Sequence, residues 1–425
     1  MELSRYNWIV EHKADTIAYN GFTGAMAVLE KDNIDSIRNL FSNEGQIDGD
    51  LEGMGEDLIT ALKHGGYIIE DGLDERAMLR IAFNSSKYNN QGNFHGYTLV
   101  MTRRCNFRCG YCFEHDTLEG GDSITDKVLD QVVKNAEEST AKFFSLTLYG
   151  GEPLLEYEKC LVVAKRCKEV VEKRGAKFGC GLISNGYLLT PERARALKES
   201  GVTHIQITID GSKETHNANR PLANGAGTYD KIISNIKECA GIVELHIRMN
   251  VKRADMDEIN ELRELVSSLP LTDIHIAAVD LSCQGDHEFY SNVKEELADV
   301  LPVEQTTLKN LHSTIGGCGA NSLKPGVVLP NGKLVRCWEH LEDYESSCSI
   351  FDNPLNDDIV TFSKWVGWDP YMPGSQCYEC RYLPGCGGGC PRSPVMNWGV
   401  KCLYVNDSEY ISSIEGSYIA LIEQK

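Results

Sequence analysis

The feature that most constrains the fold is a regular alternation of strand-type and helix-type segments through the middle of the chain. Short apolar runs rich in β-branched and aromatic residues are separated by stretches with helical periodicity. Parallel neighbouring strands need crossover helices, so this alternation predicts an α/β fold with a covered parallel sheet, a partial (β/α)6 TIM-like barrel. The six runs cover residues 97–101, 144–149, 178–183, 204–209, 244–251 and 273–279.

The segments on either side of this alternation have different patterns. Strand-type runs at residues 8–10 and 25–29 and helix-type runs at residues 34–41 and 57–63 predict a small α+β module. A polar stretch at residues 84–93 indicates a linker. After about residue 310 the chain is rich in Cys, Gly and Pro, which is typical of a region that needs metal to fold. We therefore expect three domains, at residues 1–84, 95–305 and 310–425.

Charge and hydropathy exclude several classes of partner. The chain has 42 Lys and Arg against 62 Asp and Glu, and a net charge of -20 would repel a phosphate backbone, so no nucleic acid partner is expected. No window approaches the roughly 18 apolar residues of a membrane span, and the first residues lack a signal-peptide pattern, so we expect a cytoplasmic protein with no membrane partner. In the cytoplasm 16 cysteines indicate metal or redox chemistry rather than disulfides.

Three thiols directly follow the first expected strand of the barrel. Cys105, Cys109 and Cys112 are separated by three and then two residues. A [4Fe-4S] cluster has one more iron than three thiolates can bind, so this set leaves an iron open, as an open position marks a catalytic zinc. A structural zinc site and buried core thiols are the alternatives for this segment taken alone.

The spacing of these thiols resembles the cluster motif of the radical S-adenosylmethionine (SAM) superfamily. The resemblance implies that Cys105, Cys109 and Cys112 bind a [4Fe-4S] cluster whose open iron holds the amino and carboxylate groups of SAM. It also implies that the reduced cluster cleaves SAM to a 5'-deoxyadenosyl radical. Tyr111 would then lie over the adenine, although packing is another role for an aromatic residue at this position.

Polar motifs follow the next strands, and the carboxyl ends of parallel strands gather at the active site of such barrels. Each motif alone is usually an ordinary turn, but their order, one per strand, strengthens the resemblance. In the family, the Gly-Gly-Glu-Pro motif binds the SAM amino group, polar groups lie near the ribose and an arginine suits the carboxylate. The resemblance thus assigns to SAM binding Gly150, Gly151, Glu152, Ser184, Asn185, Thr208, Arg220 and Asn250, together with Tyr111.

Seven further cysteines have spacings that resemble the SPASM domain of radical SAM enzymes acting on peptides and proteins. Without the barrel upstream, Cys377, Cys380, Cys386 and Cys390 would also suit a zinc ribbon. The interleaved family pattern implies two auxiliary [4Fe-4S] clusters, and hence three clusters in all. It assigns Cys377, Cys380, Cys386 and Cys402 to the distal cluster, and Cys318, Cys337 and Cys390 to the proximal cluster.

The proximal set departs from the complete family pattern, because residues 311–317 lack the further cysteine that precedes the first ligand in fully ligated members. The fourth ligand is left open. Cys283 and Cys348 lie in polar, irregular stretches, where each is either a distant ligand or a thiol without a role. Four other cysteines have the apolar setting of small core residues, namely Cys160, Cys167, Cys180 and Cys239.

Taken together, the resemblance implies an enzyme that modifies a ribosomally synthesised precursor peptide. Residues 1–84 would be a winged-helix-like domain that holds the leader of this peptide by adding it as a strand to a sheet edge. An external donor such as flavodoxin or ferredoxin would supply electrons. An open iron in the proximal cluster favours a Cys thioether crosslink, because it could hold the substrate thiolate and take up an electron.

Other functions remain open at this point. An anaerobic sulfatase-maturing dehydrogenase, which forms formylglycine, shares the barrel and SPASM domain but usually lacks a long domain before its first cluster motif. Another peptide crosslink or an epimerisation would use the same opening step. A non-enzymatic electron carrier or zinc module would not explain the motifs at the strand ends. The residues do not identify a general base, the peptide, the bond formed or the oligomeric state.

Overall fold

The structure is a computed structural model that divides into two compact units. The sheet unit comprises Asn89–Leu297 and Ser322–Ser363, and the terminal unit comprises Met1–Tyr88, Ala298–Asn321 and Lys364–Lys425. The domain limits expected from the sequence stay predictions. All residues are described except 44–46, 90–92, 113, 115–120, 252–256, 259, 262–263, 265–268, 270–272, 279–317, 325, 339–340, 342–347, 353–358, 397–398, 401, 403–405 and 424–425.

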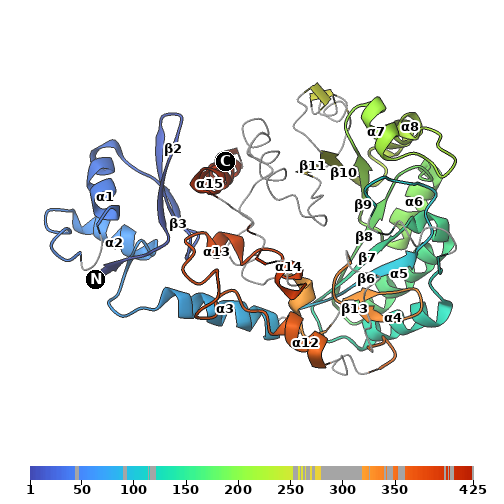
Figure 1. Cartoon of the computed structure of the whole chain (residues 1–425), viewed down its shortest axis with the longest axis horizontal. Coiled ribbons are helices and arrows are strands. Elements are labelled where there is room, and N and C mark those ends of the chain that lie inside the picture. Colours follow the sequence, from blue (N-terminus) through green and yellow to red (C-terminus); the bar gives the residue numbers. More distant parts are fainter. Residues whose placement is uncertain are drawn as a thin grey trace. The chain divides into compact units, whose positions relative to one another are not determined.

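The sheet unit is built on parallel strands that lie side by side in their sequence order (Figure 1). Each of the six predicted runs forms one of these strands, so the predicted parallel α/β sheet is confirmed. In β7, buried Phe144, Leu146 and Leu148 alternate with partly exposed residues, the period expected of a strand. The strands are β6 (Phe94–Thr102), β7 (Phe143–Gly150), β8 (Lys177–Ser184), β9 (His204–Ile209), β10 (Glu244–Val251) and β11 (Asp273–Ala278).

Helices connect these strands as crossovers. The Thr125 hydroxyl accepts a hydrogen bond from the Val128 N–H and caps α4. The Thr190 hydroxyl accepts from the Arg193 N–H and caps α6, with Pro191 in the first turn. The elements are α4 (Asp126–Glu138), η4 (Pro153–Glu156), α5 (Tyr157–Lys173), α6 (Pro191–Ser200), α7 (Lys213–Asn219) and α8 (Tyr229–Cys239).

Two short strands extend the sheet beyond β6. Strand β12 (Val327–Val328) pairs parallel with β6, and β13 (Leu334–Val335) pairs antiparallel with β12. Their side chains bury an apolar cluster that includes Val100 of β6. The cysteines predicted to be core residues are buried in this unit, as is Cys348: Cys160, Cys167, Cys180 and Cys239 are each at most 1% exposed. None of the described helices is long and apolar enough to cross a membrane.

The N-terminal part of the terminal unit has the predicted α+β character. The predicted strand and helix runs correspond to β2 (Asn7–His12), β4 (Met26–Val28), α1 (Ile34–Phe41) and α2 (Glu56–His64). Between β2 and β4 lies β3 (Asp15–Asn20), which the sequence analysis missed and which is almost wholly buried. These three strands form an antiparallel sheet, and β1 (Glu2–Leu3) pairs with β5 (Ile68–Ile69).

The linker predicted at residues 84–93 is wrong for its first half, because α3 (Glu75–Asn89) continues through this polar stretch. The helix is held by tertiary packing rather than by its own pattern: Leu79 and Phe83 are buried, and the Lys87 ammonium donates to the Trp368 carbonyl at 3.0 Å. Residues 90–92 of the predicted linker lie outside the described residues.

The Cys-rich C-terminal part contains one long helix that the sequence analysis did not predict. Helix α15 (Asp407–Glu423) lies beside β2 in Figure 1 and packs Tyr410, Ile414 and Tyr418 against Trp8 and Val10 of that strand. Both ends of the chain therefore share one hydrophobic core. The shorter elements are η1 (Lys31–Asn33), η7 (Gly319–Asn321), α12 (Ile359–Val366), α13 (Leu383–Cys386) and α14 (Arg392–Val395).

Candidate functional site

The three-thiol loop begins where β6 ends, and backbone hydrogen bonds hold it in place. The Arg108 N–H donates to the Pro221 carbonyl at 2.8 Å, and the Gly110 N–H donates to the Asn219 carbonyl at 3.1 Å. The Ala223 N–H donates in turn to the Asn106 carbonyl at 2.9 Å. The segment that follows α7 thus forms the support of the loop.

The three thiols of this loop are partly buried. Burial raises the pKa of Cys105 to about 12 and that of Cys112 to about 11, and it also raises the pKa of Cys109. The charge of Glu152, and to a smaller extent those of Cys109 and Cys112, act in the same direction on the pKa of Cys105. Thiols that resist ionisation in this way fit a site completed by a cationic metal group, which favours thiolates.

The Gly-Gly-Glu-Pro motif at the end of β7 packs directly against the start of this loop. A Cβ at Gly150 would lie 2.4 Å from the Thr102 carbonyl oxygen, and one at Gly151 would lie 2.4 Å from the Arg104 carbonyl oxygen. Gly150 also has a φ of 124°, which L side chains rarely adopt. The two glycines therefore allow close backbone approach, which fixes the end of β7 to the thiol loop.

The carboxylate of Glu152 is completely buried and joins the ends of β7 and β8. Its Oε1 accepts from the Leu154 N–H and the Ser184 hydroxyl, both at 2.9 Å, and its Oε2 accepts from the Asn185 N–H at 2.8 Å. Burial raises its pKa, and these hydrogen bonds act in the opposite direction. A carboxylate has about four acceptor positions, so one on Oε2 is still available to an ammonium group.

Asn185 connects the end of β8 to the thiol loop. Its Nδ2 donates to the Asn106 side-chain oxygen at 2.8 Å and lies 3.9 Å from the Cys105 sulfur. Its Oδ1 accepts from the Tyr187 N–H, so the side chain is fixed at both ends. The predicted residues at the ends of β7 and β8 are thus brought together with Cys105.

Tyr111 is held by three polar side chains, from the residue after β9, the end of α7 and strand β10. Its hydroxyl donates to the Asp210 carboxylate at 2.6 Å and accepts from Arg220 Nη1 at 2.6 Å and from Asn250 Nδ2 at 3.3 Å. Arg220 is nearly buried, and its Nε has no hydrogen-bond partner among the described residues. A buried guanidinium with an unused donor fits an incoming carboxylate. Thr208 is also nearly buried, on β9 opposite Arg248 of β10.

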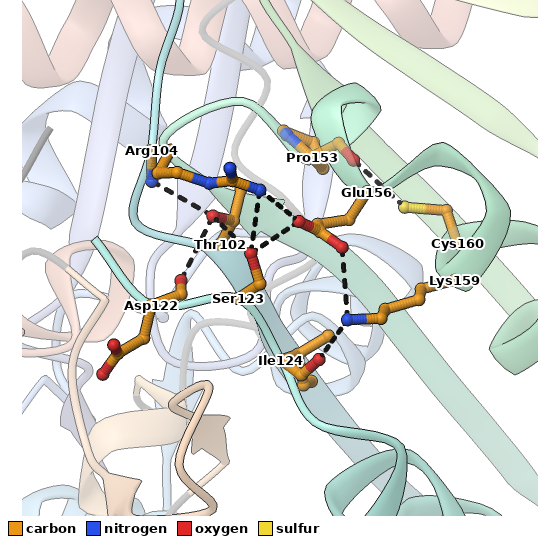
Figure 2. Close-up of polar contacts among 9 residues, drawn as sticks. All are labelled: Thr102, Arg104, Asp122, Ser123, Ile124, Pro153, Glu156, Lys159 and Cys160. Atoms are coloured by element: carbon orange, nitrogen blue, oxygen red, sulfur yellow. Dashed lines mark hydrogen bonds and ion pairs between the residues drawn. The ribbon is translucent and has the colours of Figure 1, made fainter. Parts of the chain in front are cut away.

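A second polar network, absent from the sequence analysis, positions the entry to the thiol loop. Figure 2 shows that Arg104 Nη2 donates to the Ser123 hydroxyl at 3.0 Å and to Glu156 Oε1 at 2.6 Å, while Lys159 pairs with Glu156 Oε2 at 3.2 Å. Burial raises the pKa of Glu156, but the hydrogen bond from Ser123 and the charge of Lys159 lower it by more. The residues come from three separate segments, and no local pattern marks them.

The predicted auxiliary-cluster cysteines are divided between the two units. The four assigned to the distal cluster lie in the terminal unit, and the charges of Cys386, Cys380 and Cys402 all act on the pKa of Cys377, which burial raises to about 12. Cys318 and Cys390 are exposed in the terminal unit, and Cys337 belongs to the sheet unit. Cys283 lies outside the described residues. No three described His, Cys, Asp or Glu side chains are grouped to hold a single metal ion.

Known proteins with similar sequences include members of one enzyme superfamily. The family model of the radical SAM superfamily matches residues 99–266. The chain is 24% identical over 216 residues to a GTP 3',8-cyclase of Clostridium perfringens, which covers 50% of this chain and 63% of the cyclase. It is 23% identical over 314 residues to the mycofactocin maturase MftC of Mycolicibacterium smegmatis, covering 69% of this chain and 77% of MftC. The chain thus spans less than two thirds of the cyclase relative.

Solved structures with the same fold extend further along the chain. The structure described as native anSMEcpe with bound AdoMet and Cp18Cys peptide has a TM-score of 0.62 at 20% identity, covering 78% of this chain and 99% of that chain. Streptococcus suis SuiB has a TM-score of 0.51 at 14% identity, covering 92% of this chain and 95% of that chain. The domain that carries Cys105, Cys109 and Cys112 is a radical SAM domain, and the superfamily implies SAM and a [4Fe-4S] cluster as its cofactors.

Proposed function

We propose that this protein is a radical SAM enzyme that modifies a ribosomally synthesised peptide and forms a Cys thioether crosslink. The observation that carries the radical SAM part is the convergence of the Cys105–Cys112 loop with Glu152, Asn185 and Arg220 at the carboxyl ends of the parallel strands. When bound there, the cluster and SAM supply a 5'-deoxyadenosyl radical that removes a hydrogen atom from the substrate. The cytoplasm is the proposed location, with flavodoxin or ferredoxin as electron donor.

In this proposal each strand end has one task toward SAM. The free acceptor position of Glu152 receives the amino group, and the unused Nε–H of Arg220 donates to the carboxylate. Tyr111, fixed by Asp210 and Asn250, borders the adenine, while Ser184 and Thr208 line the ribose side. Asn185 orients the loop next to Cys105. Together these contacts hold SAM against the open iron.

A peptide substrate is supported by two kinds of observation. SuiB has been solved bound to its precursor peptide SuiA, and MftC is named as a maturase, and these proteins resemble the present chain over most of its length. In addition, β4 pairs with β3 on one side, and none of the described strands pairs with its other side. An open edge of this kind suits addition of a leader peptide as a strand, with residues 1–84 as the winged-helix-like recognition domain.

We propose three [4Fe-4S] clusters in this protein. The proximal cluster has only three proposed cysteine ligands, and its open iron would hold the substrate thiolate during crosslink formation. The ligands proposed for the proximal cluster are Cys318, Cys337 and Cys390, which leave one iron for a substrate thiolate. We expect a Cys-containing substrate peptide to change the electron paramagnetic resonance (EPR) spectrum of the auxiliary clusters, and its Cys-to-Ser analogue to change it far less. Equal effects of the two peptides would exclude thiolate capture.

The second candidate function is formylglycine formation in a sulfatase. It is favoured by the anSMEcpe structure, 99% of which is covered by the present chain, and by a 28% identical stretch of 142 residues in a cysteine-type anaerobic sulfatase-maturating enzyme of Clostridium novyi. A sulfatase peptide with a target Cys distinguishes the two functions by mass spectrometry. Formylglycine product would replace the thioether proposal with this one.

The radical SAM assignment is tested by replacing Cys105, Cys109 and Cys112 together by Ala. Reduced wild-type protein should cleave SAM to 5'-deoxyadenosine and methionine, and the triple variant should lose this activity because its cluster cannot bind. The matched control is Cys167→Ala, which removes a buried core thiol of the same unit. Cleavage by the triple variant at the wild-type rate would contradict the assignment.

A further inference from the structure

Two tyrosine hydroxyls in the terminal unit are buried without a hydrogen-bond partner. Tyr6 and Tyr371 are both 0% exposed, and neither hydroxyl has a partner among the described residues. A buried hydroxyl that makes no hydrogen bond lowers stability, because it loses its contact with water and gains no partner, so such groups are rare in the absence of a role.

Both tyrosines lie beside the cysteines proposed for the distal cluster. Tyr6, Tyr371 and Cys377 belong to one buried cluster, and Cys380 packs against it. Its other buried members are apolar side chains: Leu79, Phe83 and Leu383.

The two phenol hydroxyls can act as hydrogen-bond donors, because a phenol carries its proton at neutral pH. The thiols of Cys377 and Cys380 are the acceptors that share the buried cluster with them.

The N-terminal segment is fixed against this site by a further contact. Arg5 Nη2 donates at 3.1 Å to both the backbone carbonyl and the carboxylate of Glu379, which lies between Cys377 and Cys380. The Arg5 N–H donates at 3.0 Å to the buried Glu75 at the start of α3. These contacts of Arg5 fix the backbone next to Tyr6 beside the Cys-x-x-Cys segment.

We propose that Tyr6 and Tyr371 donate hydrogen bonds to the sulfurs of the distal iron–sulfur cluster, so that the N-terminal domain is part of the site of this cluster. The inference rests on the proposed function, because it assumes that Cys377, Cys380, Cys386 and Cys402 hold a cluster. Hydrogen bonds to cluster sulfurs are among the determinants of reduction potential, and they stabilise the more negative, reduced form. A segment that belongs to the peptide-binding domain therefore tunes the electron acceptor.

The test compares Tyr6→Phe and Tyr371→Phe in the full chain, in a background that lacks the other clusters. This background carries Cys105→Ala, Cys109→Ala, Cys112→Ala and Cys337→Ala, so that the distal cluster is the one that remains. The matched control is Tyr67→Phe, which removes a buried hydroxyl that donates to the Ala18 and Ala25 carbonyls in another part of the same unit. Iron content and the midpoint potential, from an EPR-monitored redox titration, are measured for each protein.

We expect all variants to bind the cluster, and each of Tyr6→Phe and Tyr371→Phe to shift the oxidised-to-reduced equilibrium about tenfold toward the oxidised form, which is about 59 mV for a one-electron couple. Tyr67→Phe should leave the potential unchanged. If the Tyr-to-Phe variants bind iron but keep the midpoint potential of the background protein, the inference is wrong, although the assignment of a distal cluster is retained. If the background protein binds no iron, the assignment of a distal cluster is wrong, and the inference fails with it.

A second measurement covers the case in which Tyr6→Phe does not fold or load. The background protein with both tyrosines intact is unfolded in D2O, so that its exchangeable protons are replaced by deuterons, and its cluster is then reconstituted. The reduced cluster is examined by pulsed electron–nuclear spectroscopy. Strongly coupled exchangeable deuterons that disappear in Tyr371→Phe support the inference. A cluster without such deuterons contradicts it.

Discussion

The two units of this protein are assembled in opposite ways. Strands β6 to β11 of the sheet unit come from one stretch of the chain, and each of them pairs with the next in sequence. The terminal unit instead packs residues from both ends of the chain into shared cores, as with Tyr6 and Tyr371 or Trp8 and Tyr410. Closing such long loops costs entropy, so a unit of this kind depends on strong packing between the two ends.

The packing between the chain ends is mainly apolar. Ion pairs also connect them, such as Arg76 with Glu379 at 2.7 Å and Arg80 with Asp369 at 2.6 Å. The carboxylate of Glu379 is 71% exposed, however, and exposed pairs contribute little. Tyr6, Phe83 and Tyr371 are fully buried, and at about 25 cal/mol per Å2 of apolar surface such side chains dominate the energetics. The two ends therefore form one folding unit.

The largest effect is expected from deletion of residues 1–88. This deletion removes Tyr6, Leu79 and Phe83 from the core around Cys377, and truncation of each large core side chain costs about 3–5 kcal/mol. The sum approaches the whole stability of a typical domain, so we expect the remainder of the terminal unit to unfold while the sheet unit stays folded. Hydrogen exchange should show loss of protection at residues 371–386 and retained protection in β6–β9.

This outcome would refine a simpler view of the N-terminal domain. If residues 1–84 were a separate recognition module, their deletion would weaken peptide binding and leave the Cys-rich region intact. Unchanged protection at residues 371–386 after the deletion would show that the shared core is dispensable.

A matched pair of core substitutions tests whether the units are independent. Phe83→Ala in the terminal unit and Phe144→Ala in the sheet unit each remove a side chain that is 0% exposed, at a cost of about 3–5 kcal/mol. We expect each substitution to lower the unfolding free energy of its own unit, measured by hydrogen exchange under increasing urea. Equal destabilisation of both units by either variant would mean that they unfold as one.

The smallest effect concerns the pH dependence of the sheet unit. Burial, with a smaller effect of the Arg220 charge, lowers the pKa of His216 to about 3, whereas an unfolded His titrates near pH ~6.5. Below pH ~6.5 the unfolded chain binds a proton that the folded unit does not, so stability falls as the pH is lowered. The Asp210 N–H donates to His216 Nδ1, and His216→Asn keeps an acceptor near this position.

Stability measured from pH 7 to pH 4 should therefore decline less steeply in His216→Asn than in the wild type, by a slope equivalent to about one proton. Subtracting the two pH profiles removes the contributions of other titrating groups. One such group is His95, because burial lowers its pKa to about 4. Parallel pH profiles would show that His216 is protonated in the folded protein.

The sequence by itself determined the parts of this protein that depend on local pattern. Apolar runs of the right length, separated by stretches with helical periodicity, predicted the parallel sheet. The position of Cys105, Cys109 and Cys112 directly after β6 followed from the same pattern. Glu152 and Asn185 could be placed at the ends of β7 and β8 because parallel strands bring their carboxyl ends to one edge of the sheet.

Tertiary structure alone decided the features that depend on contacts between distant residues. Helix α3 continues through a polar stretch because Phe83 and Leu79 are buried by Tyr371 and Leu383. The pairing of Arg104 with Glu156, and the location of Tyr6 beside Cys377, leave no local signal either. A sequence pattern records the face that a segment buries, but it does not record which segment covers that face, since hydrophobic contact is not directional.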